Sequence, residues 1–186
     1  YESFTSACQL GDEIYFATDG YGIVIYDGLR RKWREGYRKK DDKNTTGSFL
    51  IDDHVWEVRS GAAFTVYRDK SGNVGLLSKE KHQPLIFGDD ESALSLAAEG
   101  ISLWVATARG VIRYRFEKEN ARRIGFFEWP ESKRAETPRL GLDDRGLFAI
   151  FRIGGTASLR RFRFDIKTDK WIPENTSDLE KSFRRF

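Results

Sequence analysis

The residue types most often used in catalysis are sparse in this chain, and none stands in a familiar catalytic motif. The 186 residues include two histidines, His54 and His82, and one cysteine, Cys8. The sequence contains no GxSxG, no phosphate loop ending in GK[ST], no HExxH and no CxxC. Nucleophilic, nucleotide-binding and zinc chemistry therefore have no recognisable location. We expect no catalytic residues, no metal site and no cofactor.

Paired carboxylates are the remaining chemical signal, because two of them can hydrolyse a glycoside or help to hold calcium. Acidic pairs stand at 41–42, 52–53, 89–90 and 143–144, and His54 follows one of them. All of these pairs fall where turns are predicted, so we interpret them as solvated turn residues. Cys8 lies in an alternating apolar segment and is interpreted as a small buried hydrophobe.

The elements that must position any site come from a fourfold internal repeat. Its aromatic anchors are Tyr15, Trp56, Trp104 and Phe148, spaced by 41, 48 and 44 residues. A short alternating apolar stretch precedes each anchor, and a glycine-containing turn with a second β-prone run follows it. Alternating apolar and aromatic residues predict strands, and the Gly and Asp clusters predict hairpins. Each repeat therefore has the length and pattern of four short strands.

A period of 40 to 50 residues with four strands per unit is typical of a β-propeller blade. We predict an all-β propeller in one domain over residues 1–186. The expected repeats span about 4–40, 48–80, 93–128 and 138–173, with a short C-terminal tail or helix at 175–186. Four blades fit either a complete ring or part of a larger one. If the chain is whole, the ring should close by face-to-face packing of its first and fourth blades.

Two motifs resemble known propeller repeats. The segment LWVAT at 103–107 with VIRYRFE at 111–117 is similar to the two-component regulator propeller, the sensor propeller of bacterial hybrid histidine kinases. A Trp six residues after an Asp, at Asp27 to Trp33 and Asp165 to Trp171, resembles kelch repeats. The resemblance implies a sensing role and favours an extracytoplasmic location. The second repeat departs most from the pattern.

The candidate binding residues lie in the turns predicted after the second strand of each repeat. Such turns gather at one mouth of a propeller's channel. The residues expected there are Asp19, Tyr21, Arg59, Arg109 and Arg152. Guanidinium groups at a channel mouth would suit a carboxylate or phosphate ligand. The alternative is coincidence, because the chain has twenty arginines.

The basic segment at 30–40 holds seven Lys or Arg residues, but a net charge of +3 is small. We interpret this segment as protection of an exposed edge strand, which disfavours nucleic acid as a partner. The longest apolar run is about five residues, so no transmembrane segment is predicted. We expect a non-catalytic binding or sensing module for a small anionic ligand or a protein partner. The alternative is a propeller enzyme acting on polysaccharide, as a lyase or glycosidase, or a fragment of one. The oligomeric state stays open.

Overall fold

The structure is a computed structural model that describes residues 3–37, 54–77, 82–85, 91–117, 120–130, 135–153 and 159–175. Strands occur in four groups of four. The first group is β1 (Phe4–Leu10), β2 (Glu13–Thr18), β3 (Ile23–Asp27) and β4 (Lys32–Tyr37). The second is β5 (Val55–Ser60), β6 (Thr65–Asp69), β7 (Val74–Leu77) and β8 (His82–Leu85). The third is β9 (Ser95–Glu99), β10 (Ser102–Ala106), β11 (Gly110–Glu117) and β12 (Asn120–Glu128). The fourth is β13 (Ala135–Asp143), β14 (Gly146–Ile153), β15 (Leu159–Asp165) and β16 (Lys170–Glu174).

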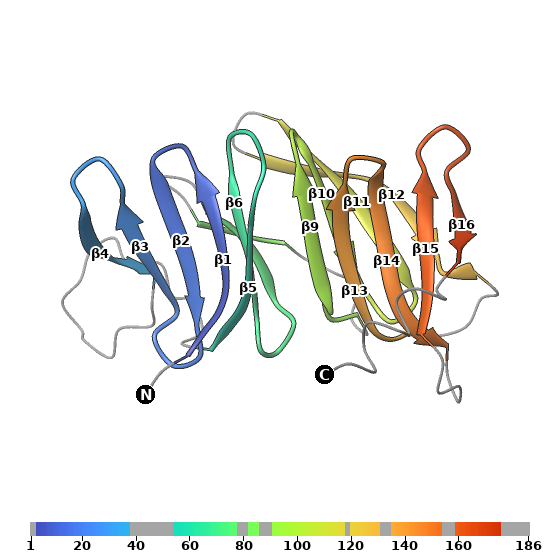
Figure 1. Cartoon of the computed structure of the whole chain (residues 1–186), viewed down its shortest axis with the longest axis horizontal. Helices are drawn as coiled ribbons and strands as arrows, with labels where there is room; N and C mark the ends of the chain where they lie inside the picture. The colour runs from blue at the N-terminus through green and yellow to red at the C-terminus, as the bar shows by residue number, and fades with distance from the viewer. Residues whose placement is uncertain are drawn as a thin grey trace.

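Each group forms one antiparallel sheet in which the strands follow chain order. Figure 1 shows the four sheets following one another in chain order from left to right. Clusters of buried apolar side chains lie between consecutive sheets. This arrangement confirms the predicted all-β propeller with four four-stranded blades. We call the sheets blades 1 to 4, the face toward the next blade the forward face, and the face toward the previous blade the rear face.

Turn chemistry explains where the strands end. Thr18 and Thr107 each close a turn by donating from Oγ1 to a glycine carbonyl, that of Gly22 at 3.0 Å and of Gly110 at 3.1 Å. The Asp of each Asp-to-Trp motif caps the outer hairpin, since Asp165 accepts from the backbone N–H of Lys167 at 2.9 Å. Short polar side chains that bond the backbone locally are what such turns require.

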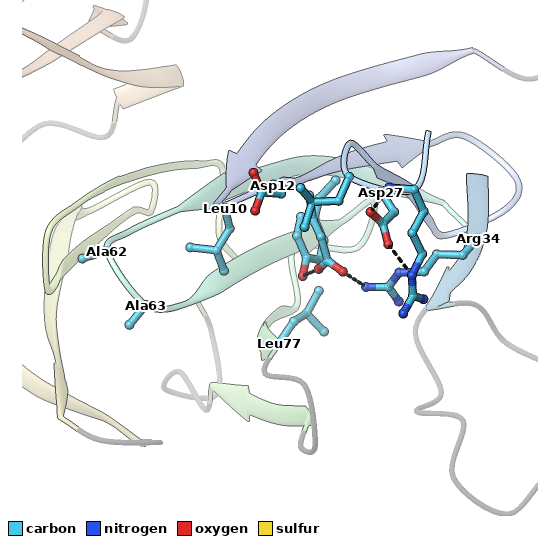
Figure 2. A pocket seen from close by; sticks show the side chains of 12 residues that line it. Leu10, Asp12, Asp27, Arg34, Ala62, Ala63 and Leu77 are labelled. Carbon is cyan, nitrogen blue, oxygen red and sulfur yellow. Dashed lines mark hydrogen bonds and ion pairs between the residues drawn. The ribbon is translucent and has the colours of Figure 1, made fainter. Parts of the chain in front are cut away.

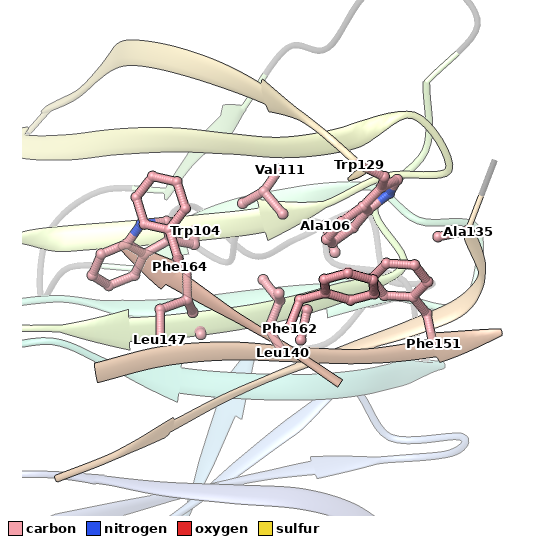
Figure 3. Close-up of a cluster of buried hydrophobic side chains, with 12 residues drawn as sticks. Trp104, Ala106, Val111, Trp129, Ala135, Leu140, Leu147, Phe151, Phe162 and Phe164 are labelled. Carbon is pink, nitrogen blue, oxygen red and sulfur yellow. The ribbon is translucent and has the colours of Figure 1, made fainter. Parts of the chain in front are cut away.

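Alternation along each strand places apolar side chains in three seams between consecutive blades. The seam between blades 1 and 2 contains Tyr15, Ala17, Ile25 and Tyr67. Figure 3 shows the seam between blades 3 and 4, where Trp104 and Trp129 of blade 3 lie with apolar side chains of blade 4. A single four-stranded sheet cannot bury both faces, so these seams supply the hydrophobic core.

Polar side chains on the innermost strands also tie one blade to the next. Ser6 Oγ of β1 accepts from the N–H of Val58 on β5 at 3.3 Å. Ser95 Oγ of β9 accepts from the N–H of Leu140 on β13 at 3.1 Å. Buried backbone groups must find partners, and these hydroxyls supply them where neighbouring sheets are not hydrogen-bonded strand to strand.

The predicted closure of the ring is wrong for the part of the chain that the structure describes. Strong packing between sheets joins β1 to β5, β5 to β9 and β9 to β13, and no comparable packing joins blade 1 to blade 4. In Figure 1 the blue first blade and the red fourth blade stand at opposite ends of the row. Among the described residues, no other blade therefore packs on the rear face of blade 1 or on the forward face of blade 4.

The anchor pattern places the second strand of the second repeat too early in the chain. Trp56 lies on β5, the first strand of its blade, and its side chain is 40% exposed. The counterpart anchors Tyr15, Trp104 and Phe148 lie on second strands. A bulge between Val55 and Glu57 removes Trp56 from the alternating pattern, so a conspicuous aromatic residue marked the wrong strand.

Some expectations fall outside the described residues. They are the acidic pairs at 41–42, 52–53 and 89–90, the start of the repeat expected at 48–80, and the tail or helix after residue 175.

Candidate ligand-binding faces

The turns between strands gather at two opposite ends of the blades, which we name face A and face B. Face A holds the turns β2–β3, β6–β7 and β10–β11 and the end of β14. Face B holds the turns β1–β2, β5–β6, β9–β10 and β13–β14. Hydrogen bonds between blades occur on both faces, since Ala93 N donates to Gly72 O at 3.0 Å on face A and Ala62 N donates to Gly100 O at 2.7 Å on face B.

Four of the five predicted binding residues share face A, namely Asp19, Tyr21, Arg109 and Arg152. Arg59 does not, because it lies near the end of β5, the first strand of blade 2, and so beside face B. Its guanidinium contacts Glu57 at 2.8 Å and Ser6 Oγ at 2.9 Å. The prediction that Arg59 lies with the other arginines is wrong, and its cause is the early alignment of the second repeat.

Arg109 and Arg152 lie on neighbouring blades and are connected through one backbone segment. Ala108 O, next to Arg109, accepts from Ala135 N at 3.0 Å. Ala135 in turn pairs across the strands with Ile153, the residue after Arg152. Both arginines are exposed, and among the described residues neither guanidinium has an ion pair. The two cations are thus held at one edge of face A and stay open to solvent.

The turn that carries Arg109 is rigid. Arg109 N and Gly110 N both donate to Thr107 Oγ1 at 3.3 Å. Trp129, which is 1% exposed, donates from its indole Nε1 to Thr107 O at 2.9 Å and from its backbone N to Arg109 O at 3.2 Å. An ordered turn presents its guanidinium without a large entropic cost on binding.

Asp19 and Tyr21 stand on the β2–β3 turn at the blade 1 end of face A. Asp19 contacts His54 Nδ1 of blade 2 at 2.5 Å, so its carboxylate connects two blades. Tyr21 is 42% exposed, and its backbone N donates to Thr18 Oγ1 at 3.0 Å. Sequence reasoning missed Lys70, which lies on the adjacent β6–β7 turn with its ammonium 5.9 Å from the centre of the Trp56 ring. The sequence Asp-Lys-Ser-Gly around it is typical of a turn, but the neighbours of Lys70 depend on tertiary structure.

Face B carries a cleft of about 880 Å³ between blades 1 and 2 that the sequence did not predict. Figure 2 shows ion pairs at Arg34 and at Asp27, whereas no contact is drawn to the carboxylate of Asp12. Arg34 contacts Glu13 at 2.5 Å, and Arg30 lies 3.8 Å from Asp27. Tyr15 donates its hydroxyl hydrogen to Glu13 at 2.8 Å. Both arginines of the cleft thus have a carboxylate partner, so the cleft offers an anionic ligand fewer open cations than face A does.

No cluster of three or more His, Cys, Asp or Glu side chains that could hold a metal ion occurs in the described ranges. Over those same ranges, no helix is long and apolar enough to cross a membrane. Burial between blades 1 and 2 raises the pKa of the Cys8 thiol to about 11. A thiol with so high a pKa is a poor nucleophile at neutral pH.

Neither the protein-family models nor the curated proteins give a match to this chain. Solved structures do. BT3049 of B. thetaiotaomicron, whose extracellular domain is assigned to a hybrid two component system, matches 95% of this chain and 23% of its own, with a TM-score of 0.63 and 15% identity. The N-terminal domain of Nup159 matches 92% of this chain and 47% of its own, with a TM-score of 0.59 and 12% identity. YCF48, solved bound to D1 peptide, matches 92% of this chain and 52% of its own, with a TM-score of 0.53 and 15% identity.

The chain spans less than half of the Nup159 domain and about a quarter of the BT3049 domain. At such identities, the likeness concerns the fold. The BT3049 structure agrees with the two-component resemblance that the repeats indicated, and the kelch-like spacing stays a prediction.

Proposed function

We propose that this propeller is a non-catalytic binding module that holds an acidic segment of a protein partner on face A. The observation that carries the proposal is the pair Arg109 and Arg152, exposed on adjacent blades and without a carboxylate partner in the described chain. Two guanidinium groups on neighbouring blades can each engage a carboxylate in a bidentate way.

A protein partner is favoured over a small anion by the openness of this face. The arginines and Tyr21 stand on exposed turns of separate blades, and a segment that crosses several turns would contact more of them than one small anion could. Two of the neighbouring folds support such a mode, since Nup159 has been solved together with Dbp5 and YCF48 with a peptide.

The test measures binding of a fluorescently labelled polyglutamate peptide by anisotropy over a series of salt concentrations. A charge-assisted hydrogen bond contributes about 1.5–3 kcal/mol, so Arg109→Ala and Arg152→Ala should each weaken binding about tenfold or more. Binding should also weaken steeply with salt, because these charges are exposed to solvent.

Arg122→Ala is the matched control, because it removes the same charge from an exposed position on β12 of blade 3. We expect it to leave peptide affinity nearly unchanged. Equal losses for Arg122→Ala and Arg109→Ala would mean that net charge alone attracts the peptide, and the proposal would be wrong. An unchanged affinity for Arg109→Ala would also contradict it.

A further inference from the structure

The rear face of blade 1 is an exposed aromatic patch. It consists of Phe4, Phe16, Tyr26 and Trp33, and Phe4 and Trp33 are 61% and 58% exposed. The rings contact one another, with centroids 5.3 Å apart for Phe16 and Trp33 and 5.2 Å apart for Tyr26 and Trp33. The terminal repeat of a stacked array normally presents a polar outer face. Blade 1 presents the opposite.

The equivalent face of blade 4 shows what such a surface does. Trp171 follows Asp165 by six residues, as Trp33 follows Asp27, and it pairs with Phe164 as Trp33 pairs with Tyr26. In blade 4 this face is covered by blade 3. Trp171 lies 5.2 Å from Trp129, and Phe164 lies 4.7 Å from Phe127 of blade 3.

The surface that covers an aromatic rear face is therefore the forward face of another blade. In blade 3 this forward face includes Trp104, with the guanidinium of Arg113 5.6 Å from its ring centre. Blade 4 repeats the arrangement on its own forward face, where Arg163 lies 5.5 Å and Arg161 4.3 Å from the centre of the Phe148 ring. Among the described residues, no blade covers this second face.

The forward face of blade 4 also presents guanidinium groups and an apolar side chain that can contact aromatic rings. Asp143 and Glu174 pair with Arg161 at 3.0 and 2.8 Å, and these ion pairs restrain its guanidinium 4.3 Å from the centre of the Phe148 ring. Ile172, 48% exposed, adds an apolar side chain beside them. Stacked guanidinium groups are attracted to the faces of aromatic rings.

We propose that the aromatic rear face of blade 1 binds the forward face of blade 4 of a second copy of this chain. The two surfaces lie at opposite ends of one chain, so they cannot meet within it in this arrangement (Figure 1). In a head-to-tail pair each copy supplies one surface of each type. Two identical seams then form, and the assembly closes as a ring.

The experiment determines the mass of the 186-residue protein in solution by light scattering over a concentration series. We expect a dimer, twice the 21.5 kDa of the chain. Trp33→Glu and Ile172→Glu each damage one surface and should each give a monomer. Phe4→Lys tests the first surface at a second, highly exposed position. Ile124→Glu, a 47% exposed position on the internal blade 3, should remain dimeric. Circular dichroism checks that every variant is folded.

Mixing the two variants tests whether the seam joins blade 1 of one copy to blade 4 of the other. Trp33→Glu leaves the forward face of blade 4 unchanged, and Ile172→Glu leaves the rear face of blade 1 unchanged. An equimolar mixture should therefore regain a dimer through one intact seam. A wild-type protein that stays monomeric throughout the series overturns the proposal. So does a dimer that Ile172→Glu leaves intact, because that outcome means that two rear faces of blade 1 pair with each other.

Discussion

Trp33 and Trp171 occupy the same position in blades 1 and 4, six residues after a turn-capping Asp and opposite an aromatic residue on the preceding strand. Trp171 lies 5.2 Å from Trp129 of the neighbouring blade, whereas Trp33 is 58% exposed. The same local sequence pattern thus leads to different environments, because burial of a rear face depends on whether another blade packs on it. Trp171 lies in a seam between two blades, whereas Trp33 lies on an end surface.

Truncation of two tryptophans should have unequal consequences. Trp104 is 5% exposed inside the seam between blades 3 and 4, so Trp104→Ala should lower the free energy of unfolding by about 3–5 kcal/mol. Trp56 is 40% exposed on a bulge, and Trp56→Ala should cost about 1 kcal/mol. Urea unfolding followed by circular dichroism measures both. Equal losses would show that the bulge is not formed as the structure places it.

The buried ion pair of blade 2 should be sensitive to loss of one partner. Glu57 and Arg68 lie 3.2 Å apart, and each side chain is 6% exposed. Glu57 also accepts from Leu96 N of blade 3 at 3.2 Å. Glu57→Ala should destabilise the fold by about 3–5 kcal/mol, because it leaves the Arg68 charge buried without a partner.

The double variant Glu57→Leu with Arg68→Leu is the control for this prediction. Replacing both charges with apolar side chains should recover most of the loss in the same unfolding measurement. A double variant as unstable as Glu57→Ala would show instead that the hydrogen bond to blade 3 is the larger contribution.

Acid should remove the stabilisation that the Asp143 carboxylate gives to blade 4. Hydrogen bonds from Arg163 hold the pKa of Asp143 at about 2, below its ordinary value of 3.8. A carboxyl group whose pKa is lower in the folded state than in the unfolded state stabilises the fold. This stabilisation is complete above the pKa of the unfolded state and is lost as the pH falls through the pKa of the folded state. The stabilisation by Asp143 should therefore disappear between about pH 4 and pH 2.

Urea midpoints for the wild type and Asp143→Asn, measured from pH 5 downward, test this expectation. The difference between them should shrink across that window. Arg163→Gln removes the cause of the shift, so in its background the Asp143→Asn substitution should show a much weaker dependence on pH. A difference in urea midpoint between the wild type and Asp143→Asn that stays constant from pH 5 to pH 2 would contradict the lowered pKa of Asp143.

Cys8 should react slowly with alkylating reagents in the native protein. Burial raises the pKa of its thiol to about 11, and little thiolate is present near neutral pH. Iodoacetamide labelling followed by mass spectrometry should be slow at pH 8 and fast in urea. Tyr67→Ala, which thins the seam between blades 1 and 2, should accelerate labelling. Native labelling as fast as that of the unfolded chain would place Cys8 outside this seam.

The strands and turns of this protein follow from local patterns. Alternating apolar residues, the glycine turns after Thr18 and Thr107, and the capping Asp27 and Asp165 each depend on neighbours a few residues away. Four blades were therefore predictable. The prediction failed at Trp56, because a single bulge changes which residues alternate, and composition alone does not reveal a bulge.

The candidate site depended on longer-range relations. Arg59 would lie with Arg109 if it ended the second strand of its blade, but it lies near the end of the first strand and so at the opposite face. Its ion pair with Glu57 becomes visible only in the tertiary structure. Likewise, the proximity of Arg109 to Arg152 requires the hydrogen bond between Ala108 and Ala135 across two blades. Local sequence specifies the blades because hairpins satisfy their own backbone hydrogen bonds. Which faces are buried and which charges remain open is decided by packing between blades, since burial and ion pairing depend on residues distant in the chain.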